Sequence, residues 1–205
     1  MNGKSNDDQY LQIKKRCRLE EKVKGSRFIG TASPIETEEE AIEFIDEMKK
    51  EFHSASHNCW AWKIGVGKSQ KYRYNDSGEP SGTAGQPIMK AIDSTRISNV
   101  CVVITRYFGG VKLGKGGLMR AYGQTAYSVL KSSEPSRKFA VESLTFEADF
   151  DFVSMVHFII ESFDAELVDS RYEDKVSFVV NVRASRAADF KGKLTEATNG
   201  RIRFK

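Results

Sequence analysis

The chain has 205 residues, of which 40% are hydrophobic and 29% charged, and its formal net charge is +4. This is the composition of a soluble globular protein that is long enough to bury a core in one large domain or two small ones. Its longest apolar runs, such as VCVVI at 100–104, fall far short of the roughly 18 residues of a membrane-spanning helix. The N-terminal segment has no apolar signal core. We therefore expect a cytoplasmic protein with no membrane partner.

The positive charge is unevenly distributed along the chain. Residues 1–135 hold 21 Lys and Arg against 16 Asp and Glu, and eight of those acidic residues lie within 36–51, together with two lysines. Without that segment, the rest of 1–135 holds 19 basic residues against 8 acidic ones. Such a surplus attracts anionic partners, including RNA and DNA. An ordinary solvated surface rich in lysine gives the same count, so charge alone does not decide.

Hydrophobic periodicity and turn residues divide the first part of the chain into strands and helices. The clearest element is a helix over 37–52, where Thr37 and Glu40 form a capping box ahead of an acidic outer face. The apolar run at 99–108 is typical of a central strand covered on both faces. The other predicted elements are two strands within 9–33, a strand at 57–67, turns over 71–87, a helix that begins at Pro87 and a helix that begins at Leu118.

Residues 133–138 are polar, contain a proline and are predicted to be a linker. After them the predicted order is strand, helix, two strands, helix and strand, which is the βαββαβ order of a ferredoxin-like unit. The strands are expected at 141–150, 165–173, 175–183 and 201–205, and the helices at 152–163 and 185–198. We therefore predict an α+β protein of two domains, 1–135 and 136–205.

A glycine-rich segment, RYFGGVKLGKGGLMRAYG at 106–123, holds six of the sixteen glycines. Five of them lie between a predicted strand and a predicted helix: Gly109, Gly110, Gly114, Gly116 and Gly117. Backbone N–H groups at a helix N-terminus favour an anion, and Lys112, Lys115 and Arg120 can add charge-assisted contacts. The spacing matches neither a Walker A loop nor a dinucleotide-binding turn, so we expect no cofactor. The alternative is that the glycines only permit left-handed corners.

The start of the same segment places a cation beside two aromatic rings. Arg106, Tyr107 and Phe108 stand at the end of the predicted strand 99–108. Such a group suits phosphate contact combined with base stacking. The pattern therefore favours nucleic-acid binding at this corner.

A second loop, DSGEPSGTAGQP at 76–87, carries the carboxylates of Asp76 and Glu79 and the hydroxyl of Thr83. As an enzyme site it would offer a general base or a carboxylate pair for a metal ion. As structure it is a rigid series of turns that caps a helix, because Asp, Ser and Gly are common turn residues. The loop contains no histidine or evident nucleophile, so we predict no catalytic residue.

His57 and Cys59 form an H-x-C pattern that suggests zinc or a reactive thiol. The chain has only three histidines and three cysteines, and none forms a second C-x-x-C or H-x-x-x-H pair, so a zinc site lacks ligands. The odd number of widely spaced cysteines implies no disulfide framework. We therefore expect no metal and interpret both residues as packed positions of a strand.

Four segments together resemble the IMPACT family: SRFIG at 26–30, HNCWAW at 57–62, GEPSGTAGQP at 78–87 and the glycine-rich segment at 106–123. The resemblance runs from about residue 19 to residue 131, and the rest of the chain resembles the small second domain of bacterial and archaeal members. It implies a ribosomal protein S5 domain 2-like fold followed by a ferredoxin-like domain similar to domain V of elongation factor G.

The family resemblance also bears on function. Eukaryotic members regulate translation by competing for the activator of a kinase that phosphorylates an initiation factor, through an additional N-terminal domain that this sequence is not expected to have. We therefore do not transfer that role. The residues that match the family's blocks are Asp76, Glu79, Pro80, Gly82, Thr83 and Gly85, with Arg106 through Gly117 and Arg120.

We predict that loops 76–87 and 106–120 meet to form one basic hollow that binds RNA or the translation machinery without catalysis. One alternative is an enzyme on a phosphorylated small molecule, in which Arg106 holds the phosphate and Asp76 or Glu79 acts as a base or holds Mg²⁺. The other is a protein-interaction module that uses the acidic helix 37–52 and the ferredoxin-like domain to bind a protein partner instead of nucleic acid.

Overall fold

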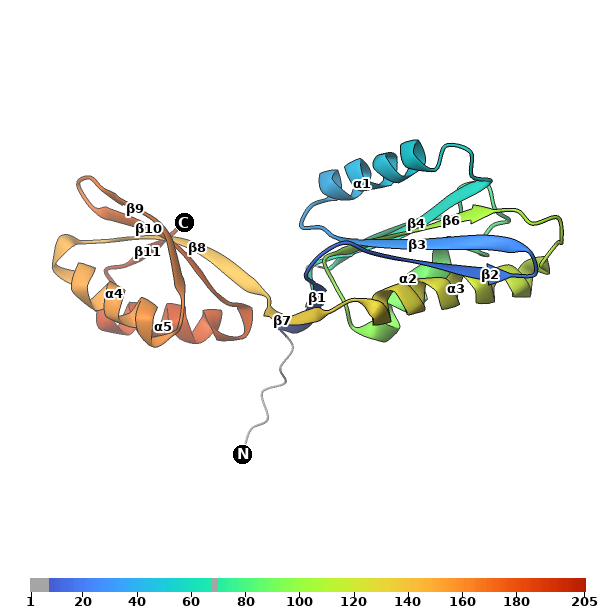
Figure 1. Ribbon diagram of the computed structural model, residues 1–205. Helices are drawn as coiled ribbons and strands as arrows, with labels where there is room; N and C mark the ends of the chain where they lie inside the picture. Colours follow the sequence, from blue (N-terminus) through green and yellow to red (C-terminus); the bar gives the residue numbers. More distant parts are fainter. Residues whose placement is uncertain (1–7, 68–69) are drawn as a thin grey trace, which may run out of the picture. The chain divides into compact units, whose positions relative to one another are not determined.

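A computed structural model describes residues 8–67 and 70–205 of the chain. The chain divides into two units: Tyr10–Lys138 form the first, and Phe139–Lys205, with residues 8 and 9, form the second. Figure 1 shows the helices and strands of each unit. Within the described part of the chain, every helix is too short or too polar to cross a lipid bilayer.

The first unit is built on a five-stranded antiparallel sheet with the spatial order β2-β3-β6-β4-β5. Its strands are β2 (Cys17–Val23), β3 (Ser26–Pro34), β4 (His57–Ile64), β5 (Lys71–Asn75) and β6 (Val100–Tyr107). A second sheet of two strands pairs β1 (Gln9–Ile13) with β7 (Pro135–Phe139). The order places β6, the most apolar strand, at the centre of the large sheet.

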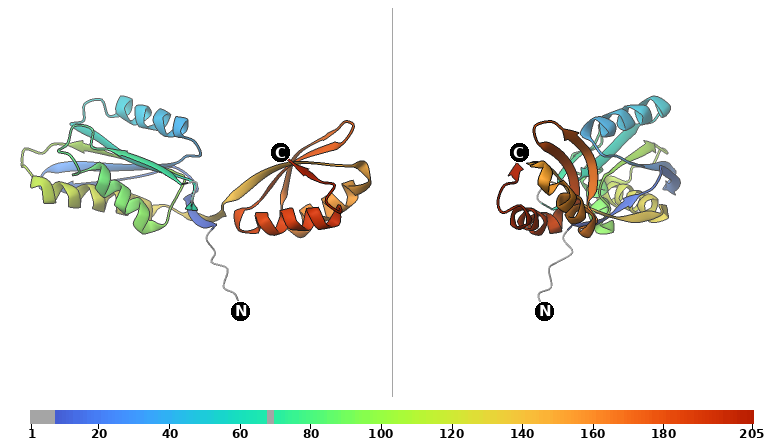
Figure 2. Two further views of the ribbon diagram at one scale, coloured as in Figure 1. Left: turned by 180° about the vertical axis from the view of Figure 1, so that it is seen from behind. Right: turned by 90° about the vertical axis from the view of Figure 1, so that its left-hand side faces the viewer.

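Helices cover both faces of this sheet, as Figures 1 and 2 show. The helix α1 (Glu38–Glu51) lies on one face, and α2 (Gly85–Thr95) and α3 (Gly114–Ser132) lie on the other. Successive side chains of a strand point to opposite faces, so Val102 and Ile104 join the core under α2 and α3, whereas Cys101 and Val103 join the core under α1. The prediction that strand 99–108 is covered on both faces is confirmed.

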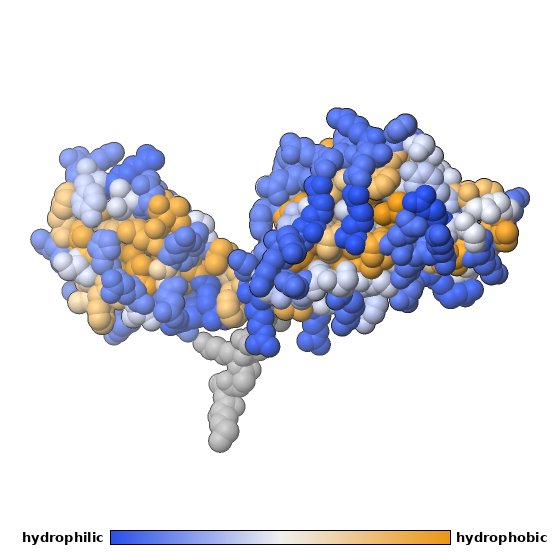
Figure 3. Space-filling model, in the orientation of Figure 1, coloured by the Kyte–Doolittle hydropathy of each residue, from blue (hydrophilic) through white to orange (hydrophobic). Residues whose placement is uncertain are grey.

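Thr37 caps α1 as predicted, but the Glu40 side chain reaches the backbone N–H of Glu36, one residue before the N-cap, so the capping box is only half formed. The backbone N–H of Glu40 donates to Thr37 Oγ1 at 3.1 Å, and the Glu40 carboxylate in turn accepts from the backbone N–H of Glu36 at 2.7 Å. Phe44 and Met48 pack inward, while the outer side of this helix is hydrophilic in Figure 3. The sequence therefore predicted both the start and the orientation of α1.

Three predictions about the strands were wrong. Residues 9–33 form three strands instead of two, because β1 leaves the large sheet to pair with β7. Residues 71–75, expected to be turns, form the edge strand β5. Residues 135–139 form β7 instead of a linker; a proline is tolerated at the first position of a strand, and the partner strand is more than a hundred residues away in the sequence.

Two helix starts also differ from the predictions. The helix α2 begins at Gly85, two residues before Pro87. The helix α3 begins at Gly114 instead of Leu118, so Gly116 and Gly117 lie in its first turn and do not precede it. Glycine has a low helix propensity, and packing of the α3 residues that follow overrides it.

The second unit is a four-stranded antiparallel sheet with two helices on one face (Figures 1 and 2). Its elements follow the order β8 (Val141–Ala148), α4 (Val153–Ser162), β9 (Glu166–Tyr172), β10 (Val176–Arg183), α5 (Ala187–Ala197) and β11 (Arg203–Phe204). The spatial order of the strands is β11-β8-β10-β9. Both units mix helices and sheet, and the predicted α+β class is confirmed at that level.

Candidate functional site

Loops 76–87 and 106–120 lie together at one end of the first unit, as predicted. They enclose a pocket of about 340 Å³ that is lined by Glu79, Pro80, Arg106, Phe108, Lys112, Leu113, Gly114, Lys115 and Leu118. Six of these nine were predicted as site residues: Glu79, Arg106, Phe108, Lys112, Gly114 and Lys115. The apolar side chains of Pro80, Leu113 and Leu118 belong to the same two loops and make the pocket partly hydrophobic.

Arg106 forms the inner wall of the pocket. Its side chain is only 6% exposed, and its Nη1 donates to Glu79 Oε1 at 2.6 Å. The guanidinium lies between two aromatic rings, 5.5 Å from the centre of Phe28 and 5.4 Å from the centre of Phe108, which is cation–π geometry. Its Nη2 donates to Ser26 Oγ at 3.3 Å, and its buried Nε has no hydrogen-bond partner among the described residues.

Glu79 is the centre of a buried polar group. Its Oε1 accepts hydrogen bonds from Arg106 and from the hydroxyl of Tyr122, the latter at 2.8 Å, and His57 Nε2 lies 4.0 Å away. Burial, followed by the negative charges nearby, raises the pKa of the Tyr122 hydroxyl above its usual value, so this group stays protonated. A buried charge needs a partner of opposite sign. The charge of Arg106 is therefore committed to Glu79 and does not make the pocket basic.

Asp76 caps the helix α2. Its two carboxylate oxygens accept backbone hydrogen bonds from Gly82, Ala84 and Gly85 at 2.8–2.9 Å. Burial raises the pKa of this carboxyl, but the backbone hydrogen bonds to its charged form lower the pKa by more. The net pKa therefore lies below the usual 3.8. Such a carboxylate is a structural anion and a weak base. At Asp76, the structure therefore supports the interpretation of the loop as a series of turns that caps a helix.

At two of the predicted glycines, the backbone itself requires a residue without a Cβ. Gly109 crosses the turn at Gly25 so closely that a Cβ on Gly109 would stand 2.0 Å from the Gly25 carbonyl carbon. Gly114 has a φ of +69°, which disfavours residues with a Cβ. These glycines allow the sharp change of direction between β6 and α3.

The free positive charge of the pocket lies at the N-terminus of α3. Lys112 and Lys115 are exposed, and neither forms an ion pair with any described residue. The N-cap position of this helix is Leu113, and no side chain among the described residues caps it. The first backbone N–H groups of a helix have no partner within the helix and carry a partial positive charge. The two lysines and the helix end therefore form the cationic part of the pocket.

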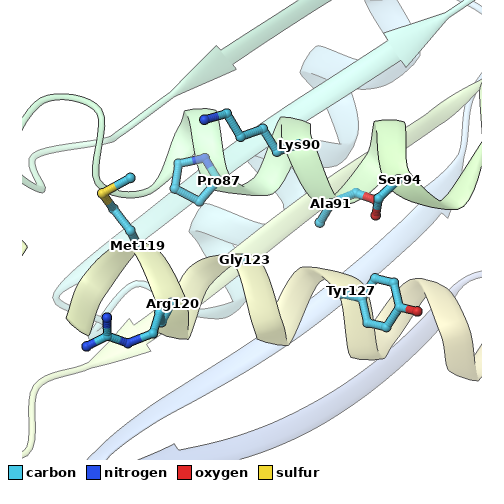
Figure 4. Close-up of a pocket in the computed structure, with 8 residues that line it drawn as sticks. All are labelled: Pro87, Lys90, Ala91, Ser94, Met119, Arg120, Gly123 and Tyr127. Atoms are coloured by element: carbon cyan, nitrogen blue, oxygen red, sulfur yellow. The ribbon is translucent and has the colours of Figure 1, made fainter. Parts of the chain in front are cut away.

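Eight of the fourteen predicted site residues do not line this pocket: Asp76, Thr83, Tyr107, Gly109, Gly110, Gly116, Gly117 and Arg120. Thr83 is buried and its hydroxyl donates to the Pro80 carbonyl, which fixes the loop. Tyr107 points to the other face of the sheet, where the Arg27 guanidinium lies 5.2 Å from its ring centre. Arg120 lines a separate apolar groove between α2 and α3, of about 370 Å³, which Figure 4 shows together with Lys90, Met119 and Tyr127.

The sequence did not single out Ser26 and Tyr122 for the site, and it left His57 as a packed strand residue. The hydroxyl of Ser26 accepts from both Arg106 and the backbone N–H of Gly109, and His57 Nδ1 lies 3.0 Å from the Ser77 carbonyl. These residues come from β3, α3 and β4. All three residues lie in segments that carry the family resemblance: Ser26 in SRFIG, His57 in HNCWAW and Tyr122 in the glycine-rich segment.

The described residues offer little for a metal or for covalent chemistry. No group of three or more His, Cys, Asp or Glu among them is placed to hold a metal ion. The Cys59 thiol donates to the Asp76 carbonyl at 2.9 Å, and burial raises the pKa of this thiol to about 12. Because the thiolate is the nucleophile, Cys59 is inert at neutral pH. What remains is a pocket suited to binding an anion that also has an apolar part.

Fold and site together define a protein of two α+β units whose larger unit carries a small pocket with lysines at a helix N-terminus. The sequence profile of the Impact N-terminal domain matches residues 24–130, and that of a domain of unknown function, DUF1949, matches residues 146–201. The chain belongs to the IMPACT family.

Similar proteins cover both units of the chain. IMPACT family member YvyE of Bacillus subtilis is 35% identical over 196 residues, which is 96% of this chain and 90% of that protein. IMPACT family member YigZ of Escherichia coli is 30% identical over 185 residues, or 90% of this chain and 91% of that protein. A crystal structure of a hypothetical protein superimposes with a TM-score of 0.72 at 28% identity and covers 96% of each chain.

Proposed function

We propose that this protein is a non-enzymatic, cytoplasmic RNA-binding protein that acts in translation and holds its ligand in the pocket between loops 76–87 and 106–120. The observation that carries the proposal is the pair Lys112 and Lys115 at the uncapped N-terminus of α3, beside the half-exposed ring of Phe108. Lysines and helix N-termini contact phosphate. Exposed aromatic rings stack on bases.

Two fold assignments support the link to translation by analogy alone. We propose that the first domain, 1–135, is related to domain 2 of ribosomal protein S5 and that the second, 136–205, is ferredoxin-like and related to domain V of elongation factor G. The βαββαβ order and the strand order β11-β8-β10-β9 agree with the second assignment.

The enzymatic alternative has less support. Its two candidate bases are already used: Asp76 by three backbone N–H groups, and Glu79 by Arg106 and Tyr122. A thermal-shift screen with nucleotides and metal ions separates the alternatives, because a ligand at ~100 times its dissociation constant adds about 2.7 kcal/mol of stability. A large shift with turnover of the compound would favour the enzyme.

The test of the proposal is a titration with a fluorescently labelled single-stranded RNA at several salt concentrations. Each neutralised phosphate of a single strand adds about 0.7 to the slope of log K against log salt, so the double variant K112A/K115A should lower the slope by about 1.4. A matched control, K90A/K131A, removes two exposed lysines of α2 and α3 that do not line the pocket, and it should leave the slope unchanged. Absent or salt-independent binding of the wild type would refute the proposal.

A further inference from the structure

We infer that the pocket binds one unpaired nucleotide, with its phosphate at the N-terminus of α3 and its base on the ring of Phe108, so that the protein selects single strands over duplexes. The inference rests on the proposed function and adds a ligand class and an orientation. It follows from the size of the pocket, the position of its free charges and the exposure of one aromatic ring.

The size of the pocket limits the ligand. A volume of about 340 Å³ is at the lower end of the roughly 300–1,000 Å³ typical of small-molecule sites. Four of the nine lining residues are apolar, namely Pro80, Phe108, Leu113 and Leu118, and most of the exposed pocket surface is apolar, so a bare phosphate would leave much of it unfilled. A single nucleotide supplies both an anion and a flat, weakly polar body.

The charges orient that nucleotide. The only pocket cations without an ion-pair partner in the described part of the chain are Lys112 and Lys115, and both flank the N-terminus of α3. Arg106 also lines the pocket, but it is paired with the buried Glu79 carboxylate at 2.6 Å. A phosphate is therefore attracted to the two lysines and the α3 N-terminus, and the sugar and base are left to the rest of the pocket.

Phe108 and Arg106 form the stacking surface. Phe108 is 50% exposed, and the Arg106 guanidinium carbon lies 5.4 Å from the centre of its ring. The backbone N–H of Phe108 donates to Ser56 Oγ at 3.1 Å, which holds the main chain at this position. Arg106 is also nine-tenths buried, lines the pocket and keeps an Nε without a hydrogen-bond partner among the described residues. An accessible aromatic ring is what base stacking requires.

Stacking of this kind needs a base that is free of its partner. In a duplex each base is already stacked and paired, and extracting it costs a few kcal/mol. The pocket therefore discriminates between single strands and duplexes without reading sequence, because every base has a π-face.

The experiment measures the affinity of the full chain for a single-stranded oligonucleotide, the same oligonucleotide in a duplex, adenosine monophosphate and inorganic phosphate. We compare the wild type with Phe108→Ala, with Phe108→Leu, which retains apolar bulk if the alanine variant is unstable, and with Phe108→Trp, which retains a ring. The control is Phe150→Ala, a phenylalanine of the second unit that is 53% exposed.

We expect Phe108→Ala and Phe108→Leu to bind the single strand about tenfold more weakly, and Phe108→Trp and Phe150→Ala to bind like the wild type. The monophosphate should bind more tightly than inorganic phosphate, and the duplex more weakly than the single strand. If the Phe108 variants bind normally while K112A/K115A loses binding, the inference is wrong and the proposed function stands. If the wild type binds no nucleic acid, both fail.

Discussion

The Glu79 carboxylate and the Arg106 guanidinium form an ion pair of 2.6 Å between two loops that are 27 residues apart, with side chains only 4% and 6% exposed. This contact ties loop 76–87 to the end of β6. Arg106 was predicted to bind an anionic ligand, but its charge is neutralised inside the protein by Glu79. The basic character of the pocket depends on its lysines instead.

Replacing Glu79 with glutamine should destabilise the fold strongly. The substitution leaves the Arg106 charge buried without a counter-charge, and breaking a buried pair in this way costs roughly 3–5 kcal/mol. Urea denaturation should show a loss of about 3 kcal/mol in the free energy of unfolding. The control is Glu20→Gln, which breaks the exposed pair with Arg27 and should barely move the midpoint. Equal effects of the two substitutions would contradict the role given to the buried pair.

Gly109 and Gly116 should respond in opposite ways to alanine. A Cβ on Gly109 would collide with the backbone of Gly25, whereas a Cβ on Gly116 meets only the flexible end of Arg120 at 3.6 Å. We expect Gly109→Ala to cost several kcal/mol, on the order of other strained core changes, and Gly116→Ala to stabilise α3 by up to about 1 kcal/mol. Thermal denaturation measures both. A tolerated Gly109→Ala would mean that the crossing at Gly25 is not tight.

Asp76 should make the free energy of unfolding decrease at acid pH. Its pKa in the folded state lies below the 3.8 of the unfolded chain, so its contribution is present at neutral pH and disappears as the pH falls through about 4 and below. Asp76→Ala should cost about 2 kcal/mol at pH 7, the upper range for loss of a helix cap. Denaturation at several pH values should show this difference shrinking as the pH falls below about 4. A constant difference would contradict a charged cap.

The three cysteines should differ in reactivity. Cys59 and Cys101 are fully buried, and burial raises the pKa of both thiols, that of Cys59 to about 12. Cys17 is partly exposed, and burial raises the pKa of its thiol as well. Mass spectrometry after brief alkylation at pH 8 should therefore find slow modification at Cys17 alone, and modification of all three after denaturation. Fast labelling of Cys59 in the folded protein would revive the reactive-thiol interpretation.

The sequence predicted those elements whose signals are local. A capping box and helical spacing of apolar residues define α1 within sixteen residues, and the apolar run of β6 indicates burial on both faces. The strand β7 was missed because it pairs with β1, more than a hundred residues away, and such a pairing leaves no signal in either segment alone. The strand β5 pairs with its sequence neighbour β4, but all five of its residues are exposed at the edge of the sheet, so no burial pattern marks it.

In the site, too, the sequence predicted what local patterns show and missed what depends on tertiary contacts. Glycine and charge patterns identified the two loops, and the family's sequence blocks favoured their proximity. They did not reveal that Glu79 neutralises Arg106, that Asp76 caps α2, or that Arg120 faces another groove. Those outcomes depend on where α3 begins and on residues such as Tyr122, which no short motif connects to Glu79.

The most direct test of the central claim is an NMR titration of the isotopically labelled full chain with a short single-stranded RNA. If the uncapped N-terminus of α3 holds phosphate, the backbone amides of Gly114, Lys115 and Gly116 should show the largest and earliest chemical-shift changes, together with the ring signals of Phe108. If these signals stay fixed while amides of the α2–α3 groove or of the second unit move, the pocket is not the binding site.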